Sequence, residues 1–197
     1  MLPLVVVSHF AALMLDAAYM VWLLPEVLYS YTHKIDAKSS AGDRNSGAVL
    51  LASIALGIFI ANWFARHEAA FAIVWQPTFI FSAGILLMVA GVVFRWYSIR
   101  MLGKYFTLRL AIQPGQTVVE DGPYRLIRHP SYSGALLTML GLGLALNNWM
   151  SVIVMLIAGF VGYSYRVKVE EDILVTALGE PYSQYIKSTK RFIPYIY

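Results

Sequence analysis

Long apolar runs separated by short polar stretches dominate the pattern of this chain. A membrane-spanning helix needs about 20 apolar residues, and the N-terminal half has three runs near this length, at residues 4–24, 46–65 and 77–94. Two shorter apolar runs, at residues 131–146 and 151–165, are separated by a pair of asparagines. We interpret these two runs as a helical hairpin. The pattern therefore predicts an all-α integral membrane protein with five transmembrane helices.

The segments outside the apolar runs have patterns of their own. Residues 98–129 contain two short extended stretches, at 107–112 and 117–119, on either side of a Pro-Gly turn. We expect this region to form a folded cap on the bundle. From Arg166 onward, apolar residues recur at helical spacing among charged ones, which predicts an amphipathic C-terminal helix.

Composition and charge agree with a membrane location. Hydrophobic residues make up 59% of the chain and charged residues 13%, whereas soluble domains carry about 25% charged residues. With five spans, fourteen of the fifteen Lys and Arg residues lie on one side and only Arg66 lies on the other. Because basic loops face the cytoplasm, we expect an external N-terminus and a cytoplasmic C-terminus, in an inner or plasma membrane. This topology, rather than nucleic-acid binding, explains the net charge of +4.

The most informative motif is a basic one that contains a proline, Arg128-His129-Pro130-Ser131-Tyr132. Proline is favoured in the first turn of a helix, and it pushes the preceding His129 out of the helical region. The free amides of Ser131, Tyr132 and Ser133, together with Arg128, would then bind a carboxylate or phosphate. The alternative is that Arg128 and His129 only mark the membrane boundary.

Glu170 and Glu171 follow the hairpin, on the same side as this motif. Neighbours on a helix point about 100° apart, so at most one of the two carboxylates faces a cleft well. That carboxylate would hold an ammonium or a ribose hydroxyl; alternatively, the acidic run is a solvated face. Arg166 lies one turn before Glu170 on the same face. It either pairs with Glu170 or presents a cation to an acidic substrate.

Other features of the spans have structural interpretations. Asp16 is the one charge in its run, and we expect it to hydrogen-bond Tyr19 or a neighbour such as Asn62. Glycines and alanines recur along the spans, and small residues let helices pack closely. We assign them to packing except at Gly134, where a role in the site stays open. The chain has no cysteine, which excludes disulfides and thiolate chemistry, and no metal-ligand spacing.

Five short motifs follow one another between about residues 102 and 194: Gly122-Pro123-Tyr124, Arg128-His129-Pro130-Ser131-Tyr132, Arg166 with Glu170-Glu171, Gly179-Glu180-x-Tyr182-x-x-Tyr185, and Arg191-Phe192-x-Pro194. In order and spacing they resemble the isoprenylcysteine carboxyl methyltransferase family of integral membrane enzymes. The resemblance covers nearly half of the chain, and the first two spans are only loosely similar. The motifs are shared more loosely with phospholipid methyltransferases and membrane sterol reductases.

The resemblance implies S-adenosylmethionine as cofactor, S-adenosylhomocysteine as product, and no metal. We expect one domain over residues 1–197, with three spans in 1–97 and a cofactor-binding part in 98–197 that includes the hairpin of 131–165 and the C-terminal helix. The implied cofactor contacts are Gln116, Thr117, Val118, Val119, Tyr124, Arg128, His129, Pro130, Ser131, Tyr132, Glu170 and Glu171. Arg166 matches the arginine expected near the substrate carboxylate. The family often has His where Gln116 stands and Leu where Val118 stands.

We therefore predict transfer of a methyl group to a lipophilic or lipidated acceptor at the cytoplasmic face of the membrane, with the carboxylate of a prenylated cysteine as the leading candidate. An ionised acceptor needs no general base, so catalysis would rest on positioning and desolvation. A phospholipid amine and a small lipophilic thiol or acid are alternative acceptors. A membrane reductase that uses NADPH and a non-enzymatic helical scaffold are alternative functions.

Overall fold

The computed structural model describes residues 8–32, 43, 45–108 and 110–196, and every regular element in these residues is helical. This confirms the predicted all-α fold. The elements are α2 (His9–Thr32), α3 (Ser46–His67), η2 (Ala69–Phe71), α4 (Pro77–Leu102), η3 (Gly103–Tyr105), η4 (Gly122–Arg125), α5 (Pro130–Ala145), α6 (Trp149–Leu178) and α7 (Glu180–Ser188).

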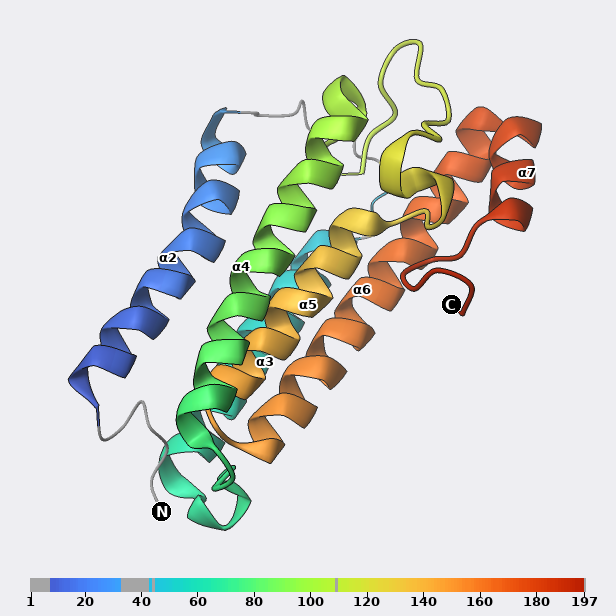
Figure 1. Cartoon of the computed structure of the whole chain (residues 1–197). Coiled ribbons are helices and arrows are strands. Elements are labelled where there is room, and N and C mark those ends of the chain that lie inside the picture. Colours follow the sequence, from blue (N-terminus) through green and yellow to red (C-terminus); the bar gives the residue numbers. More distant parts are fainter. Residues whose placement is uncertain (1–7, 33–42, 44, 109, 197) are drawn as a thin grey trace.

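Helix α5 lies at the centre of the bundle, between α4 and α6 (Figure 1). Helix α3 packs on α6, and α2 packs on the outer side of α4. At one end of the bundle, the Tyr29 hydroxyl of α2 donates to the carbonyl of Phe106 at 3.2 Å. At the other end, Ala72 pairs with Asn148 in an isolated β-bridge. The long connection that joins α4 to α5 lies at the same end of the bundle as helix α7 (Figure 1).

The apolar pattern located the spans but not all of their ends. Helices α2, α3, α4 and α6 are long and apolar enough to cross a membrane, whereas α5 has only 16 residues. The count of five spans therefore stays a prediction, and the beginning of the first run, residues 4–7, lies outside the described residues. Helix α4 continues to Leu102 instead of ending at Phe94. The last span and the amphipathic segment form one helix, α6, which ends only at Gly179 with a φ of 64°.

The cap over residues 98–129 stays a prediction, and the described residues of its two extended stretches do not form strands. Its first residues continue α4 as far as Leu102, and no strand forms in the described part of this region. The Pro114-Gly115 turn is present. The second turn forms a single 3₁₀ turn, η4. Residues 107–108, 110–112 and 117–119 are irregular.

Backbone contact between α4 and α5 depends on glycine. A Cβ on Gly134 would lie 2.7 Å from the amide nitrogen of Arg95, and a Cβ on Gly91 would lie 2.6 Å from the carbonyl of Gly134. Real Cβ atoms do not approach a backbone so closely. Gly134, whose role we left open, is therefore required for packing, as are the other small residues of this interface.

An ion pair inside the bundle connects three helices. The Arg95 guanidinium of α4 binds Glu26 of α2 through two nitrogen–oxygen contacts, of 2.5 and 3.1 Å, and it also donates to the carbonyl of Ser131 in α5 at 3.3 Å. A charge within the bundle needs such a partner, because leaving it unpaired is strongly destabilising. The pair thereby holds α2 beside α4 and fixes the first turn of α5.

Two asparagines close the hairpin between α5 and α6. Asn147 takes a left-handed conformation with a φ of 51°, and its side chain donates to the carbonyl of Pro77 at 3.1 Å. Asn148 caps α6 by accepting from the amide of Ser151 at 3.1 Å. The predicted helical hairpin is therefore confirmed, and polar side chains define its turn.

Asp16 is exposed on α2. Asn62, which we expected to contact it, donates instead to the Tyr19 hydroxyl at 3.2 Å and to the carbonyl of Ile58. The hydrogen bond between helices at this position therefore joins Asn62 to Tyr19 and, contrary to the prediction, does not involve Asp16.

The contact between α4 and α5 predicts a strong difference between two adjacent positions. Gly91→Leu would force a side chain into α5 and should destabilise the fold by about 1–3 kcal/mol. Ala90→Leu is the matched control, since Ala90 is exposed on the outer face of α4. Thermal unfolding of both variants in the same detergent measures the difference. Equal unfolding midpoints would contradict the packing described here.

Candidate functional site

A pocket opens at one end of the bundle because α5 is shorter than its neighbours. Helix α5 has 16 residues, whereas α4 has 26 and α6 has 30, so both neighbours extend beyond its first turn (Figure 1). The connection that precedes α5, residues 103–129, and helix α7 cover the space above it. The resulting pocket has an empty volume of about 820 Å³, part of which is open to solvent.

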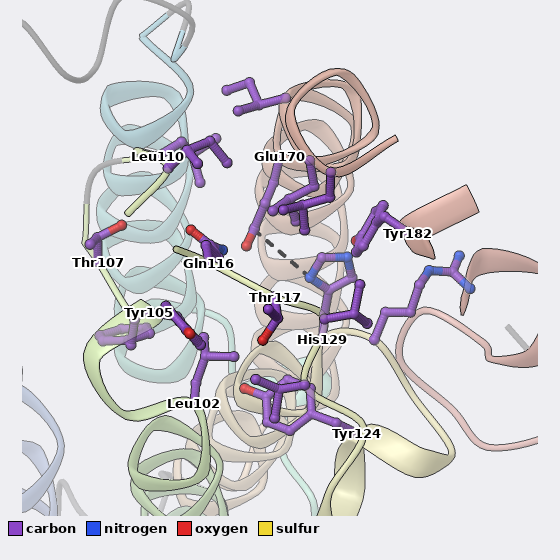
Figure 2. Close-up of a pocket in the computed structure, with 18 of the residues that line it drawn as sticks. Leu102, Tyr105, Thr107, Leu110, Gln116, Thr117, Tyr124, His129, Glu170 and Tyr182 are labelled. Atoms are coloured by element: carbon purple, nitrogen blue, oxygen red, sulfur yellow. Dashed lines mark ion pairs between the residues drawn. The ribbon is translucent and has the colours of Figure 1, made fainter. Parts of the chain in front are cut away.

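Most of the residues that we predicted to contact a cofactor line this pocket; the exceptions are Pro130 and Glu171. Figure 2 shows Glu170 of α6 directed toward His129, with Gln116 and Thr117 of the connection beside them. Segments far apart in the sequence therefore present their side chains to one cavity.

The first turn of α5 begins where the proline predicts, but its amides are less available than expected. His129 has φ −124° and ψ 57°, outside the helical region, and Pro130 is the first helical residue. The amides of Tyr132 and Ser133 both donate to the carbonyl of His129, at 3.0 and 3.1 Å. The prediction of three free amides is therefore wrong for these two, because the turn before the helix already supplies their acceptor. Of these three residues, Ser131 and Tyr132 line the pocket.

Tyr132, Glu170 and His129 form a polar cluster in the pocket wall. The Tyr132 hydroxyl donates to Oε2 of Glu170 at 2.7 Å, and Nδ1 of His129 lies 3.8 Å from the same oxygen. The imidazole stacks on the Tyr132 ring, with centroids 5.5 Å apart and planes 5° apart. Because the Glu170 side chain is 23% exposed, its carboxylate is held by the wall yet accessible to a ligand.

Glu171 points away from the pocket into a cluster of cations. Its carboxylate accepts from Nε of Arg128 at 2.8 Å and from Arg191 at 2.8 Å, and it lies 3.3 Å from Nε2 of His129. The prediction that only one of the two glutamates faces the cleft well agrees with this geometry, and that residue is Glu170. Glu171 instead holds the far side of the imidazole and so fixes the orientation of His129.

Arg128 is engaged by the protein itself. Besides Glu171, its guanidinium donates to the carbonyls of Ile186 and Thr189. We predicted a donor for a bound anion, but the partners that occupy Arg128 come from distant parts of the chain. Its main role in this structure is to hold the end of α7 against the His129 turn.

The C-terminal segment, residues 189–193, completes the site. The amides of Arg128 and His129 donate to the carbonyls of Lys190 and Arg191, at 2.7 and 3.1 Å, and Ser133 donates to the carbonyl of Phe192 at 2.6 Å. The backbone of this segment therefore pairs with the His129 turn, while the Arg191 side chain binds Glu171 and the Phe192 ring packs against His129.

Tyrosines provide the aromatic part of the wall. Tyr124, Tyr182 and Tyr185 line the pocket, and each is at least 95% buried. Burial raises the pKa of all three hydroxyls, and the negative charge of Glu170 raises the pKa of Tyr124 and Tyr182 further. They are therefore neutral donors at physiological pH; Tyr185, for example, donates to the carbonyl of Tyr124 at 2.7 Å. We predicted Tyr124 but not the other two, although their spacing of three places them on one face of α7.

The connection between α4 and α5 contributes both predicted and unexpected residues. Gln116, Thr117, Val118 and Val119 line the pocket as predicted. The Gln116 side chain also accepts from the amide of Gln113 at 2.9 Å and so closes the turn. The pocket is also lined by residues of this region that we did not predict, Leu102, Tyr105, Phe106, Leu110, Ala111 and Ile112. Nothing in their local pattern separates them from ordinary membrane-facing residues.

Arg166 does not line the pocket but lies directly behind its wall. Its Nε donates to the Tyr132 hydroxyl at 3.4 Å, and its residue is only 3% exposed. A surface ion pair with Glu170, one of the two alternatives considered, does not form. Among the described residues, no group of His, Asp and Glu side chains is arranged to hold a metal ion.

The structure therefore defines a helical membrane bundle with a polar and aromatic pocket at one end. Residues 84–176, which include α5 and most of the polar cluster, match the model of the isoprenylcysteine carboxyl methyltransferase (ICMT) family. This match confirms the relationship inferred from the motifs.

Three curated relatives agree with it. A probable protein-S-isoprenylcysteine O-methyltransferase of Oryza sativa subsp. indica is 28% identical over 120 residues, which are 60% of this chain and 63% of the rice protein. Protein-S-isoprenylcysteine O-methyltransferase A of Arabidopsis thaliana is 27% identical over 123 residues, 61% of this chain and 62% of that protein. The Schizosaccharomyces pombe enzyme is 32% identical over 109 residues, 48% of this chain and 46% of its own length. The chain thus spans less than two thirds of these relatives.

Proposed function

We propose that this protein transfers a methyl group from S-adenosylmethionine to the carboxylate of a prenylated cysteine or a similar lipophilic acid. The observation that carries the proposal is the position of Glu170, an accessible carboxylate held by Tyr132 in a pocket with an aromatic wall. The related proteins named above are methyltransferases of this type, which supports the same conclusion.

The residues present fit the cofactor. The Glu170 carboxylate suits its ammonium or ribose hydroxyls, and the buried rings of Tyr124 and Tyr182 suit its adenine. Because Arg128 is already paired, the cofactor's carboxylate would be met by His129 and the start of α5. The cofactor supplies an electrophilic methyl group on a sulfonium.

The proposed reaction requires no general acid or general base from the protein. The carboxylate oxygen forms a bond to the methyl carbon while the carbon–sulfur bond breaks, and the sulfur keeps the bonding electrons as a thioether. No proton moves, so no general base is required. The protein's contribution is to align the acceptor and exclude water. Arg166, adjacent to Tyr132, is the residue we assign to the acceptor's carboxylate.

The orientation follows from the distribution of basic residues. The end of the bundle that carries the pocket also carries Lys104, Arg125 and Arg128 of the connection before α5 and the C-terminal segment with Lys190 and Arg191. We propose that this end faces the cytoplasm, where the cofactor is available, while the acceptor reaches the site from the membrane. A reductase that uses NADPH is less well supported, because it would need basic residues for the 2′-phosphate of that cofactor. In the part of the chain that the structure describes, the basic residues that line the pocket are Arg128 and His129, and Arg128 already binds Glu171 and the carbonyl of Thr189.

A methyl-transfer assay tests the proposal. Purified protein with methyl-labelled S-adenosylmethionine should place the label on an S-prenylated N-acetylcysteine, as an ester that mild alkali releases. The methyl ester of the same compound, whose carboxylate is blocked, should stay unlabelled. Alkali-stable label on a phosphatidylethanolamine control would point to an amine acceptor instead. Absence of label on every acceptor, with folded protein, would reject the activity.

Two variants separate the cofactor role from the acceptor role. Glu170→Gln should weaken S-adenosylhomocysteine binding about ten- to a hundredfold, because it removes a charge-assisted hydrogen bond of about 1.5–3 kcal/mol. Arg166→Lys keeps the positive charge but loses the planar guanidinium, which can bind a carboxylate through two nitrogens at once. It should leave the affinity for S-adenosylhomocysteine within about threefold, less than 1.4 kcal/mol, and strongly reduce kcat.

Isothermal titration and turnover measurements provide the readouts, with Glu180→Gln, an exposed glutamate on α7, as the matched control. A cofactor defect in Arg166→Lys as large as that in Glu170→Gln would reverse the two assignments.

A further inference from the structure

Arg166 has no free nitrogen in this structure. Nε donates to Tyr132 at 3.4 Å, Nη2 donates to the carbonyl of Leu108, and Nη1 is shared between Ser46 at 3.1 Å and Asp43 at 3.5 Å. A planar guanidinium binds a carboxylate through two adjacent nitrogens. An acceptor's carboxylate can therefore bind Arg166 only if it displaces one of these partners from the guanidinium.

Asp43 is the partner best suited to yield. Its contact is the longest of the four, and it precedes α3 instead of belonging to a helix. Leu108 offers a backbone carbonyl and Tyr132 is anchored through Glu170. Asp43 is also the one partner whose charge matches that of the incoming group, so one carboxylate would replace another.

An anion is needed at this position when no acceptor is bound. The first turn of α3 lies against the guanidinium, since a Cβ on Gly47 would be 3.1 Å from Nη1 of Arg166. A cation beside a helix N-terminus is unfavourable, and a buried charge without a partner costs several kcal/mol. Asp43, whose side chain is 14% exposed, supplies the compensating charge.

We propose that Asp43 is an internal counter-ion that competes with the acceptor's carboxylate for Arg166 and so governs acceptor exchange. This inference rests on the proposed function. An ionised acceptor displaces Asp43, whereas the methyl ester that forms has lost its charge and no longer competes. Asp43 then pairs with Arg166 again and favours release of the ester. The residue thus discriminates substrate from product without contacting the cofactor.

Asp43→Asn tests this proposal, because it removes the charge but keeps an oxygen that can accept from Ser46. With S-adenosylhomocysteine present, the variant should bind the acid form of an S-prenylated N-acetylcysteine about two- to fivefold more tightly, the range expected for removal of one partly exposed competing charge. Binding of the methyl ester should change less than twofold, since a neutral group is not repelled by Asp43. Affinity for S-adenosylhomocysteine should not change.

Asp172→Asn is the control, because it removes one acidic charge from an exposed position on α6. Asp43→Ser, which also lacks the charge and keeps an acceptor, repeats the test if the asparagine variant does not fold. Unchanged or weaker binding of the acid in the folded variant would overturn the proposal and make Asp43 a structural partner of Ser46 alone. If neither the native protein nor the variant binds the acid while both bind S-adenosylhomocysteine, the proposed acceptor and the role of Asp43 fail together.

Discussion

The close packing of α5 between α4 and α6 is the constraint on which the site depends. Because glycines at this interface let the backbones touch, a helix of 16 residues can be held between neighbours of 26 and 30. The difference in length leaves space above the first turn of α5. The connection of residues 103–129 and helix α7 close that space into a pocket (Figure 1). A longer α5 would fill the position where His129 and Tyr132 now meet Glu170.

The two adjacent glutamates have different roles in the site, one structural and one directed at the ligand. The carboxylate of Glu171 is paired with Arg128 and Arg191 and lies beside His129. Its contact with Arg191 holds the C-terminal segment against the pocket. Glu170 keeps an accessible carboxylate bonded to Tyr132. The Tyr132 hydroxyl in turn accepts from Arg166, so one side chain connects the group assigned to the cofactor with the group assigned to the acceptor.

The sequence predicted the helical fold and the main residues of the pocket for different reasons. Apolar runs reveal spans because the membrane imposes length and hydrophobicity together. They do not reveal where α4 and α6 end, because both helices continue beyond the apolar run into residues that are not uniformly apolar. Pro130 located the start of α5 through local geometry alone. Gln116 to Val119 were located by the family resemblance, since an irregular connection has no periodicity to interpret.

What the sequence could not predict are pairings between distant residues. Arg128 was assigned to an anion because its acceptors, Glu171 and two carbonyls of the C-terminal part, are more than 40 residues away along the chain. The pairs Glu26–Arg95 and Asp43–Arg166 escaped notice for the same reason. Nothing in a local pattern indicates which basic residue will meet which acid once helices pack.

Hydrogen exchange with and without saturating S-adenosylhomocysteine tests most directly whether the space above α5 is the cofactor site. The account predicts slower exchange in peptides that cover residues 105–119, 126–132 and 180–186, which contain the irregular wall and α7. Peptides from residues 68–77, at the opposite end of the bundle, should not change. Protection confined to that opposite end, or no protection at any of these segments in saturated protein, would contradict the account.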